Sequence, residues 1–124
     1  MIIGIEHTAI ASPDPRKLVQ WYVETLGFRI NYDSGRTFFI KAANGSMIEI
    51  ISSEGELKPI TLKDPGLRHL ALAVSDFDAV YGQLKARNVN FLVEATDNKG
   101  VKTAFFTDPE GNILHIIQRE TPLP

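Results

Sequence analysis

Apolar residues along this chain follow two spacings, and the spacings alternate in the same order twice. Strand-like patterns mark eight segments: residues 2–11, 28–33, 36–42, 46–53, 66–74, 89–95, 101–107 and 111–119. Apolar residues at helical spacing mark one helix that begins after Asp14 and stops at Gly27. A second helix follows Ser75-Asp76-Phe77-Asp78, which resembles a capping box with Asp in place of the usual Glu, and ends near Asn88. The sequence therefore predicts strand, helix, strand, strand, strand, followed by the same five elements again.

The two halves also match residue by residue, which indicates an internal duplication. First strands match at a separation of 62 residues and later strands at 66 residues: His7 with His69, Phe39 with Phe105, Gly45 with Gly111, and Glu49 with His115. Residues 54–65 contain two prolines, a glycine and charges of both signs, and they fit neither half. We therefore expect a single domain, 1–124, made of module one at 1–53, a linker at 54–65 and module two at 66–119.

Composition narrows the chemistry and the kinds of partner. Hydrophobic residues make up 44% of the chain and charged residues 23%, with a formal net charge of −2, as in an ordinary globular protein. No basic run alternates with aromatic residues, so we expect no nucleic-acid partner. There is no cysteine, which removes disulfides and thiolate chemistry. The sequence shows neither the pattern of a signal peptide nor an apolar run of roughly 20 residues, so we expect a cytoplasmic protein without a membrane partner.

Four residues that can bind a metal ion occupy matching places on the first and last strands of each half: His7, Glu49, His69 and His115. Each shares its face with apolar neighbours, and residues 111–117 are apolar on both faces, so we expect these side chains to be shielded. A shielded ionisable group must be hydrogen-bonded, neutral or bound to something. If the two sheets face each other, the four groups can meet, and such donors suit Zn²⁺, Fe²⁺, Ni²⁺, Co²⁺ or Mn²⁺. The plainer alternative is four unrelated polar residues of the core. Phe39 and Phe105 either line a pocket beside them or simply pack.

Four segments carry a resemblance to a known family: HTAIASPDPRKLVQWYVETLGF, GSMIEI, RHLALAVSDFDAVYGQL and FFTDPEGNILHIIQ. Together they resemble the vicinal oxygen chelate family, which includes glyoxalase I, bleomycin-resistance proteins and ring-cleaving dioxygenases. The resemblance implies an α+β fold in which two βαβββ modules form a curved, mixed eight-stranded sheet with the helices on the outside. It also implies that His7, Glu49, His69 and His115 hold a divalent metal ion in that sheet, although the family usually has glutamate at the position of His115.

The resemblance further implies a metal-dependent lyase or isomerase of the glyoxalase I type, which converts a small substrate with two adjacent oxygens through an enediolate. Glu49 would be the general base that moves a proton between neighbouring carbons. One alternative is a metal-independent protein that binds a small molecule, like the bleomycin-resistance members. Another is a metal-dependent transferase or an oxygenase, and the oxygenase is disfavoured by His115 in place of glutamate. Family members of this size commonly form homodimers, in which the ligands come from one chain or from two.

Overall fold

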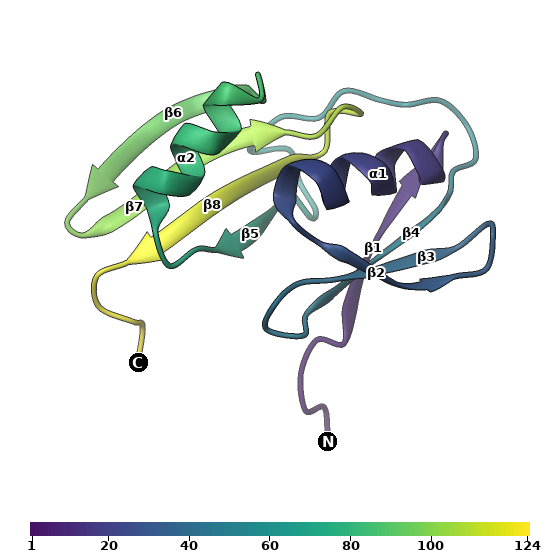
Figure 1. Cartoon of the computed structure of the whole chain (residues 1–124), viewed down its shortest axis with the longest axis horizontal. Helices are drawn as coiled ribbons and strands as arrows, with labels where there is room; N and C mark the ends of the chain where they lie inside the picture. Colours follow the sequence, from purple (N-terminus) through teal and green to yellow (C-terminus); the bar gives the residue numbers. More distant parts are fainter. The chain divides into compact units, whose positions relative to one another are not determined.

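The computed structural model describes residues 1–124, and its helices and strands follow the predicted order (Figure 1). They form two compact units, unit 1 at Met1–Leu57 and unit 2 at Lys58–Pro124. The boundary between the units lies inside the segment that the sequence predicts to be a linker. None of the helices has the length and apolar character needed to cross a membrane.

Unit 1 is a four-stranded mixed sheet with one helix packed on it. Its strands are β1 (His7–Ser12), β2 (Arg29–Asp33), β3 (Phe38–Lys41) and β4 (Met47–Ser52), in the sheet order β1-β4-β3-β2. Strands β1 and β4 run parallel, and the other neighbours run antiparallel. Helix α1 (Pro15–Leu26) contacts β3 and β4. The core lies between them and contains Ile10, Leu18, Val19, Tyr22, Phe38, Ile40, Ile48 and Ile50. We call the other side of this sheet the open face of unit 1.

Helix α1 begins and ends as the sequence predicts. The Asp14 side chain accepts a hydrogen bond of 3.3 Å from the backbone N–H of Lys17, which caps the first turn. Pro15 fills the first helical position, where no backbone N–H is needed. Gly27 has a φ of 80°, a left-handed conformation that favours glycine, and its N–H donates to the carbonyl of Val23 at 3.2 Å.

Unit 2 repeats this architecture. Its strands are β5 (His69–Ala73), β6 (Asn90–Asn98), β7 (Val101–Thr107) and β8 (Ile113–Arg119), in the order β5-β8-β7-β6. Helix α2 (Phe77–Ala86) contacts β8. The amide of Gln118 on β8 holds the first turn of this helix. It accepts from the backbone N–H of Phe77 at 2.8 Å and donates to the carbonyl of Ser75 at 2.9 Å.

The predicted capping box of α2 is wrong, because the N-cap is Asp76. Its side chain accepts from the backbone N–H of Ala79 at 3.2 Å, which places the cap one residue after Ser75. The backbone carbonyl of Ser75 is held instead by Gln118, a residue far away in the sequence. A local motif therefore identified the start of the helix but not the residue that caps it.

The hydrogen-bond registers confirm the duplication and the α+β fold of two βαβββ modules. Equivalent strand pairs have equivalent partners: His7–Met47 with His69–Ile113, and Ala9–Glu49 with Ala71–His115. The turn before each last strand repeats as well. The backbone N–H of Ala42 donates to the carbonyl of Ser46 at 2.9 Å, and that of Asp108 donates to the carbonyl of Asn112 at 3.0 Å.

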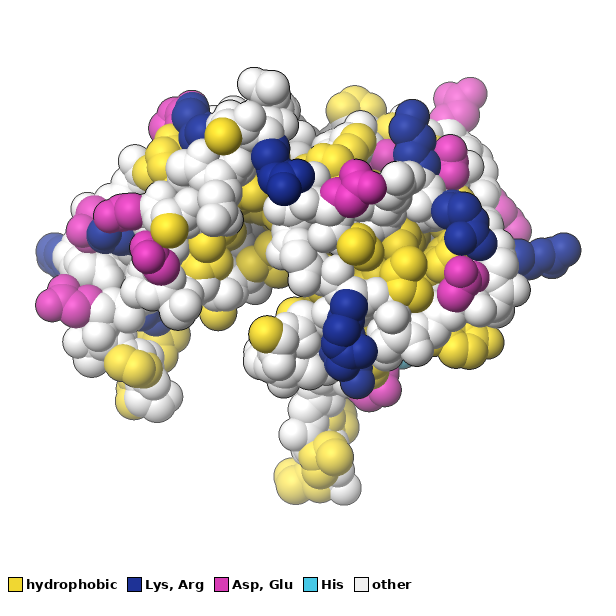
Figure 2. All heavy atoms as spheres, in the orientation of Figure 1, with side chains coloured by type: hydrophobic (Ala, Val, Ile, Leu, Met, Phe, Trp, Pro, Cys, Tyr) yellow, Lys and Arg dark blue, Asp and Glu magenta, His cyan; other side chains and the backbone are white.

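The two strands predicted to open the halves, at 2–11 and 66–74, begin later than predicted. They start at His7 and His69, because their parallel partners β4 and β8 start directly opposite these residues. Residues before His7 and His69 therefore have no partner strand with which to form backbone hydrogen bonds. Ile3 and Ile5, which the alternation had assigned to the first strand, are 104% and 90% exposed. The segment that carries them projects at the bottom of Figure 2 with its hydrophobic side chains uncovered.

Candidate functional site

In each sheet, one row of paired residues runs across all four strands, and the two rows occupy equivalent positions. The row of unit 1 consists of four successive strand partners on the open face: Ala9, Glu49, Phe39 and Tyr32. Its counterpart in unit 2 consists of Ala71, His115, Phe105 and Val93. Since side chains two residues apart on a strand share a face, His7 lies beside the first row and His69 beside the second. The residues predicted to bind metal are thus brought together as two pairs, one on each unit.

The pair on unit 1 is His7 with Glu49. The Nε2 atom of His7 lies 3.5 Å from Oε1 of Glu49, and their side chains are 36% and 23% exposed. Adjacent ligands of a tetrahedral ion with bonds of about 2.0–2.1 Å are about 3.4 Å apart, so this separation fits two ligands of one ion. Nδ1 of His7 lies 2.5 Å from Oε1 of Glu6, an arrangement that leaves Nε2 directed toward Glu49. The rings of His7 and Phe39 make an edge-to-face contact, with their centroids 5.2 Å apart.

The pair on unit 2 is His69 with His115, whose ring centroids are 4.6 Å apart. Phe105 lies against both, at 5.3 Å from His69 and 4.5 Å from His115. His115 is only 7% exposed, and neither of its ring nitrogens has a hydrogen-bond partner. Burial, followed by the charges of His69 and Arg119, lowers the pKa of His115 to about 4. The ring is therefore neutral near pH 7 and has a free lone pair on one nitrogen.

A buried imidazole without a partner is costly, because its desolvated nitrogens have lost water and gained nothing in return. A metal ion would compensate that loss, so the residues present fit one. Within the structure no three His, Asp or Glu side chains come together in an arrangement that could hold an ion. That the two pairs share one ion stays a prediction.

The expectation that all four side chains are shielded is wrong for two of them. His115 is buried and Glu49 is half-buried, but His7 and His69 are exposed. The reason lies in the sheet order: His115 and Glu49 stand on strands with neighbours on both sides, while β1 and β5 have a neighbour on one side only. An apolar alternation along the sequence does not distinguish an inner strand from an outer one.

Tyr32 lies in the same row as Glu49 and Phe39, although nothing in the sequence singles it out. The pairing of β2 with β3 shifts between Ile30 and Tyr32, which marks a β-bulge at Asn31. In a regular strand Tyr32 would share the face of Ile30, whereas the bulge turns it to the face of Phe39, and the two rings meet at 6.1 Å. No pattern of residue types predicts this bulge, so only the strand register of the structure reveals that Tyr32 lies beside Phe39.

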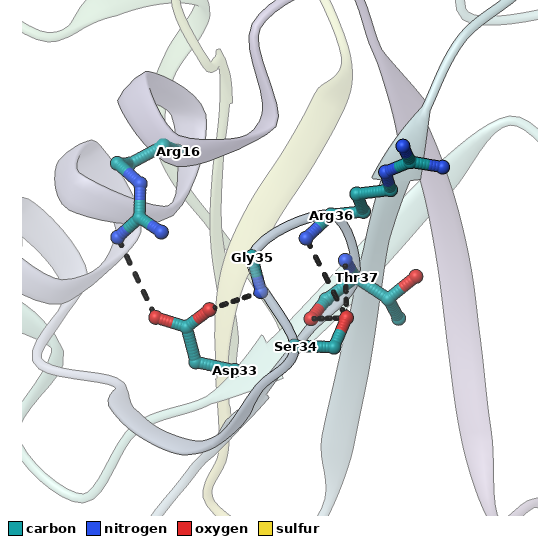
Figure 3. A network of polar contacts seen from close by, with 6 residues as sticks. All are labelled: Arg16, Asp33, Ser34, Gly35, Arg36 and Thr37. Atoms are coloured by element: carbon teal, nitrogen blue, oxygen red, sulfur yellow. Dashed lines mark hydrogen bonds and ion pairs between the residues drawn. The ribbon is translucent and has the colours of Figure 1, made fainter.

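The hairpin after Tyr32 is fixed by a network of polar contacts (Figure 3). Asp33 accepts from the backbone N–H of Gly35 at 2.7 Å and from the guanidinium of Arg16 on α1 at 3.4 Å. The hydroxyl of Ser34 accepts from the backbone N–H of Thr37 at 3.1 Å. Because Asp33 reaches the helix side of the sheet, it anchors the end of β2 and holds Tyr32 on the opposite, open face.

Comparisons with known proteins agree with this description. Residues 4–116 match the family model of the Glyoxalase/Bleomycin resistance protein/Dioxygenase superfamily. The protein YaeR of Escherichia coli strain K12 is 31% identical, and the alignment covers 93% of this chain and 95% of YaeR. A glyoxalase family protein from Enterococcus faecalis is 26% identical with a TM-score of 0.78, covering 94% of this chain and 98% of that one. The oxidase ChaP-H2 is 25% identical with a TM-score of 0.76, covering 96% and 95%.

Proposed function

The chain belongs to the Glyoxalase/Bleomycin resistance protein/Dioxygenase superfamily, and from this premise we propose that it is a metal-dependent lyase or isomerase of the glyoxalase I type. The substrate is a small molecule with two adjacent oxygens, such as a hydroxy-ketone. The observation that carries the proposal is the state of His115, a buried and neutral ring without a hydrogen-bond partner, 4.6 Å from a second imidazole. Such a ring is suited to binding a metal ion.

The donor set supports a divalent ion in number and in type. Three imidazoles and one carboxylate suit Zn²⁺, Ni²⁺, Fe²⁺, Co²⁺ or Mn²⁺. The proposal requires that the pair His7–Glu49 and the pair His69–His115 bind the same ion. With neutral imidazoles, the ion and one carboxylate leave a net charge of +1, which favours anionic oxygen ligands over neutral ones.

Glu49 is the residue that we assign to proton transfer. A bound metal ion would act as a Lewis acid toward the substrate carbonyl. The carboxylate of Glu49 takes the proton from the carbon that bears the hydroxyl, which gives an enediolate of the substrate, and returns it to the former carbonyl carbon, while the hydroxyl proton passes to the other oxygen. The Nε2 atom of His7 lies 3.5 Å from Oε1 of Glu49, which is too far for a strong hydrogen bond, so the carboxylate stays available as a base. Phe39, the strand partner of Glu49, places an apolar ring beside the carboxylate.

Metal analysis and a proton-transfer assay test this function. Protein purified without chelators is expected to contain one divalent ion per chain and to isomerise the adduct of methylglyoxal and glutathione. Glu49→Gln is expected to lower the turnover by about 100-fold or more, as the loss of a general base does. Glu24→Gln, at an exposed position of α1, is the matched control and is expected to retain full activity. Absence of any ion above trace level would refute the proposal.

We also propose that the protein forms a homodimer, and complementation shows whether the two pairs come from one chain or from two. One variant lacks the pair of unit 1 (H7A/E49A) and the other lacks the pair of unit 2 (H69A/H115A). If the ion is held between chains, mixing the two inactive variants restores part of the activity, because one site of the mixed dimer has all four ligands. Without any recovery after subunit exchange, the ligands come from one chain.

A second candidate function is a metal-independent protein that binds a small molecule. The observation in its favour is the exposed aromatic surface of unit 1, where Tyr32 is 53% exposed beside Phe39. This candidate predicts that small apolar ligands raise the thermal stability of the protein to the same extent with and without EDTA. A ligand effect that EDTA abolishes would exclude it.

A further inference from the structure

A second row of side chains lies beside the first on the open face of unit 1. It consists of four successive strand partners near one end of the strands: His7, Met47, Lys41 and Arg29. Along β3 the buried residues Phe38 and Ile40 alternate with the half-buried Phe39 and Lys41, so Lys41 shares the face of Phe39. Arg29 is its direct strand partner on β2. Two cationic side chains therefore stand side by side on the face that carries His7 and Glu49.

Neither cation has a partner in the protein. The side chains of Arg29 and Lys41 take part in no hydrogen bond, ion pair or ring contact, whereas the lysine of the second sheet, Lys102, meets Asp78 at 3.4 Å. Like charges on directly opposed strand residues repel each other and destabilise the pairing. An anion bound between the two side chains would add two attractions that outweigh this repulsion.

The second unit shows that the scaffold does not need charge at this position. The residues equivalent to Arg29 and Lys41 are Asn90 and Thr107, which are direct strand partners at the same height of the sheet. This pair is neutral, and the amide Nδ2 of Asn90 donates a hydrogen bond of 3.1 Å to the hydroxyl of Thr107. The two copies share their strand pairing here and differ in the side chains, which are charged in unit 1 and neutral in unit 2.

We propose that Arg29 and Lys41 form an anion subsite, which binds a carboxylate or phosphate group of the substrate. The inference rests on the proposed function, since it assigns the other end of the same molecule to His7 and Glu49. Lys41 and His7 are separated by strand β4, which corresponds to about 10 Å between their backbones. A guanidinium and an ammonium side by side match the several oxygens of either anion. The substrate class is therefore a small hydroxy-ketone or related compound with a negatively charged group a few bonds from its adjacent oxygens.

Three probes with the same hydroxy-ketone unit test the subsite. Dihydroxyacetone is neutral, dihydroxyacetone phosphate carries a phosphate, and 5-hydroxylevulinate carries a carboxylate. Their affinities are measured by calorimetry on the metal-loaded full-length protein, at low and at high salt. We expect at least one anionic probe to bind roughly tenfold more tightly than the neutral probe, which corresponds to one or two charge-assisted contacts. The preferred anion identifies the group, and the preference is expected to shrink at high salt.

The double variant R29N/K41T introduces the two residues that unit 2 uses, so the hairpin is expected to fold. Its preference for the anionic probe is expected to fall to about onefold, because the neutral pair makes no charge-assisted contact. The matched control K17Q/R36N removes two exposed cations of the same unit and is expected to keep the preference. Equal affinity for all three probes in the wild type, or a preference that survives in R29N/K41T, would overturn the subsite.

The failure of the subsite and the failure of the proposed function give different results. If anionic probes bind through Arg29 and Lys41 but with the same affinity in metal-stripped protein and in Glu49→Gln, the subsite stands and the metal-dependent function fails. If all probes bind only to metal-loaded protein and without regard to charge, the function stands and the subsite fails.

Discussion

Acid is expected to destabilise the metal-free protein through the buried ring of His115. Burial is the main cause that lowers the pKa of His115, from 6.5 to about 4. Between these two values the unfolded chain binds a proton at His115 that the folded protein does not bind, so the free energy of unfolding falls as the pH falls. Above about pH 6.5 the ring is neutral in both states and contributes nothing to the pH dependence. Below about pH 4 the loss is complete.

The size of this loss follows from the two pKa values. Each unit of difference corresponds to about 1.4 kcal/mol, so a shift of about 2.5 units gives about 3.5 kcal/mol in full, of which about 3 kcal/mol is lost between pH 7 and pH 4. The assay is urea unfolding followed by circular dichroism in the presence of EDTA, at steps across this range. His115→Leu removes the titrating group and keeps an apolar side chain, while the other ionisable groups remain in both proteins. The difference between the two pH profiles therefore isolates His115.

The result that would refute this reasoning is a pair of parallel profiles. If wild type and His115→Leu lose the same stability from pH 7 to pH 4, the ring is not held neutral by its surroundings. A metal ion provides a second comparison at pH 7. It is expected to stabilise the wild type in proportion to the logarithm of its concentration above the dissociation constant, and to stabilise His115→Leu much less.

Three further predictions concern residues around the site. Glu6→Gln is expected to weaken metal binding at the proposed site about tenfold in competition with a chelating dye, because the carboxylate on Nδ1 of His7 would orient this imidazole toward the ion; unchanged affinity would contradict this role. Tyr32→Val is expected to change the unfolding free energy by less than about 1 kcal/mol in urea, since the side chain is exposed and Val93 takes its place in unit 2; a larger loss would mean that the ring is part of the core. Asp108→Ala is expected to cost about 2–3 kcal/mol in the same assay, because its buried carboxylate accepts three hydrogen bonds in the turn before β8; a loss below about 1 kcal/mol would show that the turn holds itself.

The repeat and most element limits could be predicted from the sequence, because they depend on local and periodic signals. Asp14 and Gly27 act within one turn of their own helix, and the separations of 62 and 66 residues between the halves correspond to the registers of β1 with β4 and β5 with β8. The start of β1 depends instead on where β4 begins. Apolar residues such as Ile3 and Ile5 continued the alternation past the point where a partner strand exists.

The candidate site could be predicted only in part for a similar reason. The pattern located His7, Glu49, His69 and His115 on equivalent strands, and the structure places them in two pairs. It could not indicate which of them are covered, since this depends on the order of strands in each sheet. It also could not reveal Tyr32, whose orientation is set by a bulge, a change of register without a residue signature.

The sheet order also has a consequence for motion within each pair. Glu49 and His115 lie on strands that are hydrogen-bonded on both sides, whereas His7 and His69 are the first residues of strands bonded on one side of their sheet. Amide hydrogens of β4 and β8 are therefore expected to exchange with deuterium more slowly than those of β1 and β5. Each pair is therefore expected to combine a less mobile side chain with a more mobile one, so that binding at the proposed site would move the histidine and leave the hydrogen bonds of the inner strand intact.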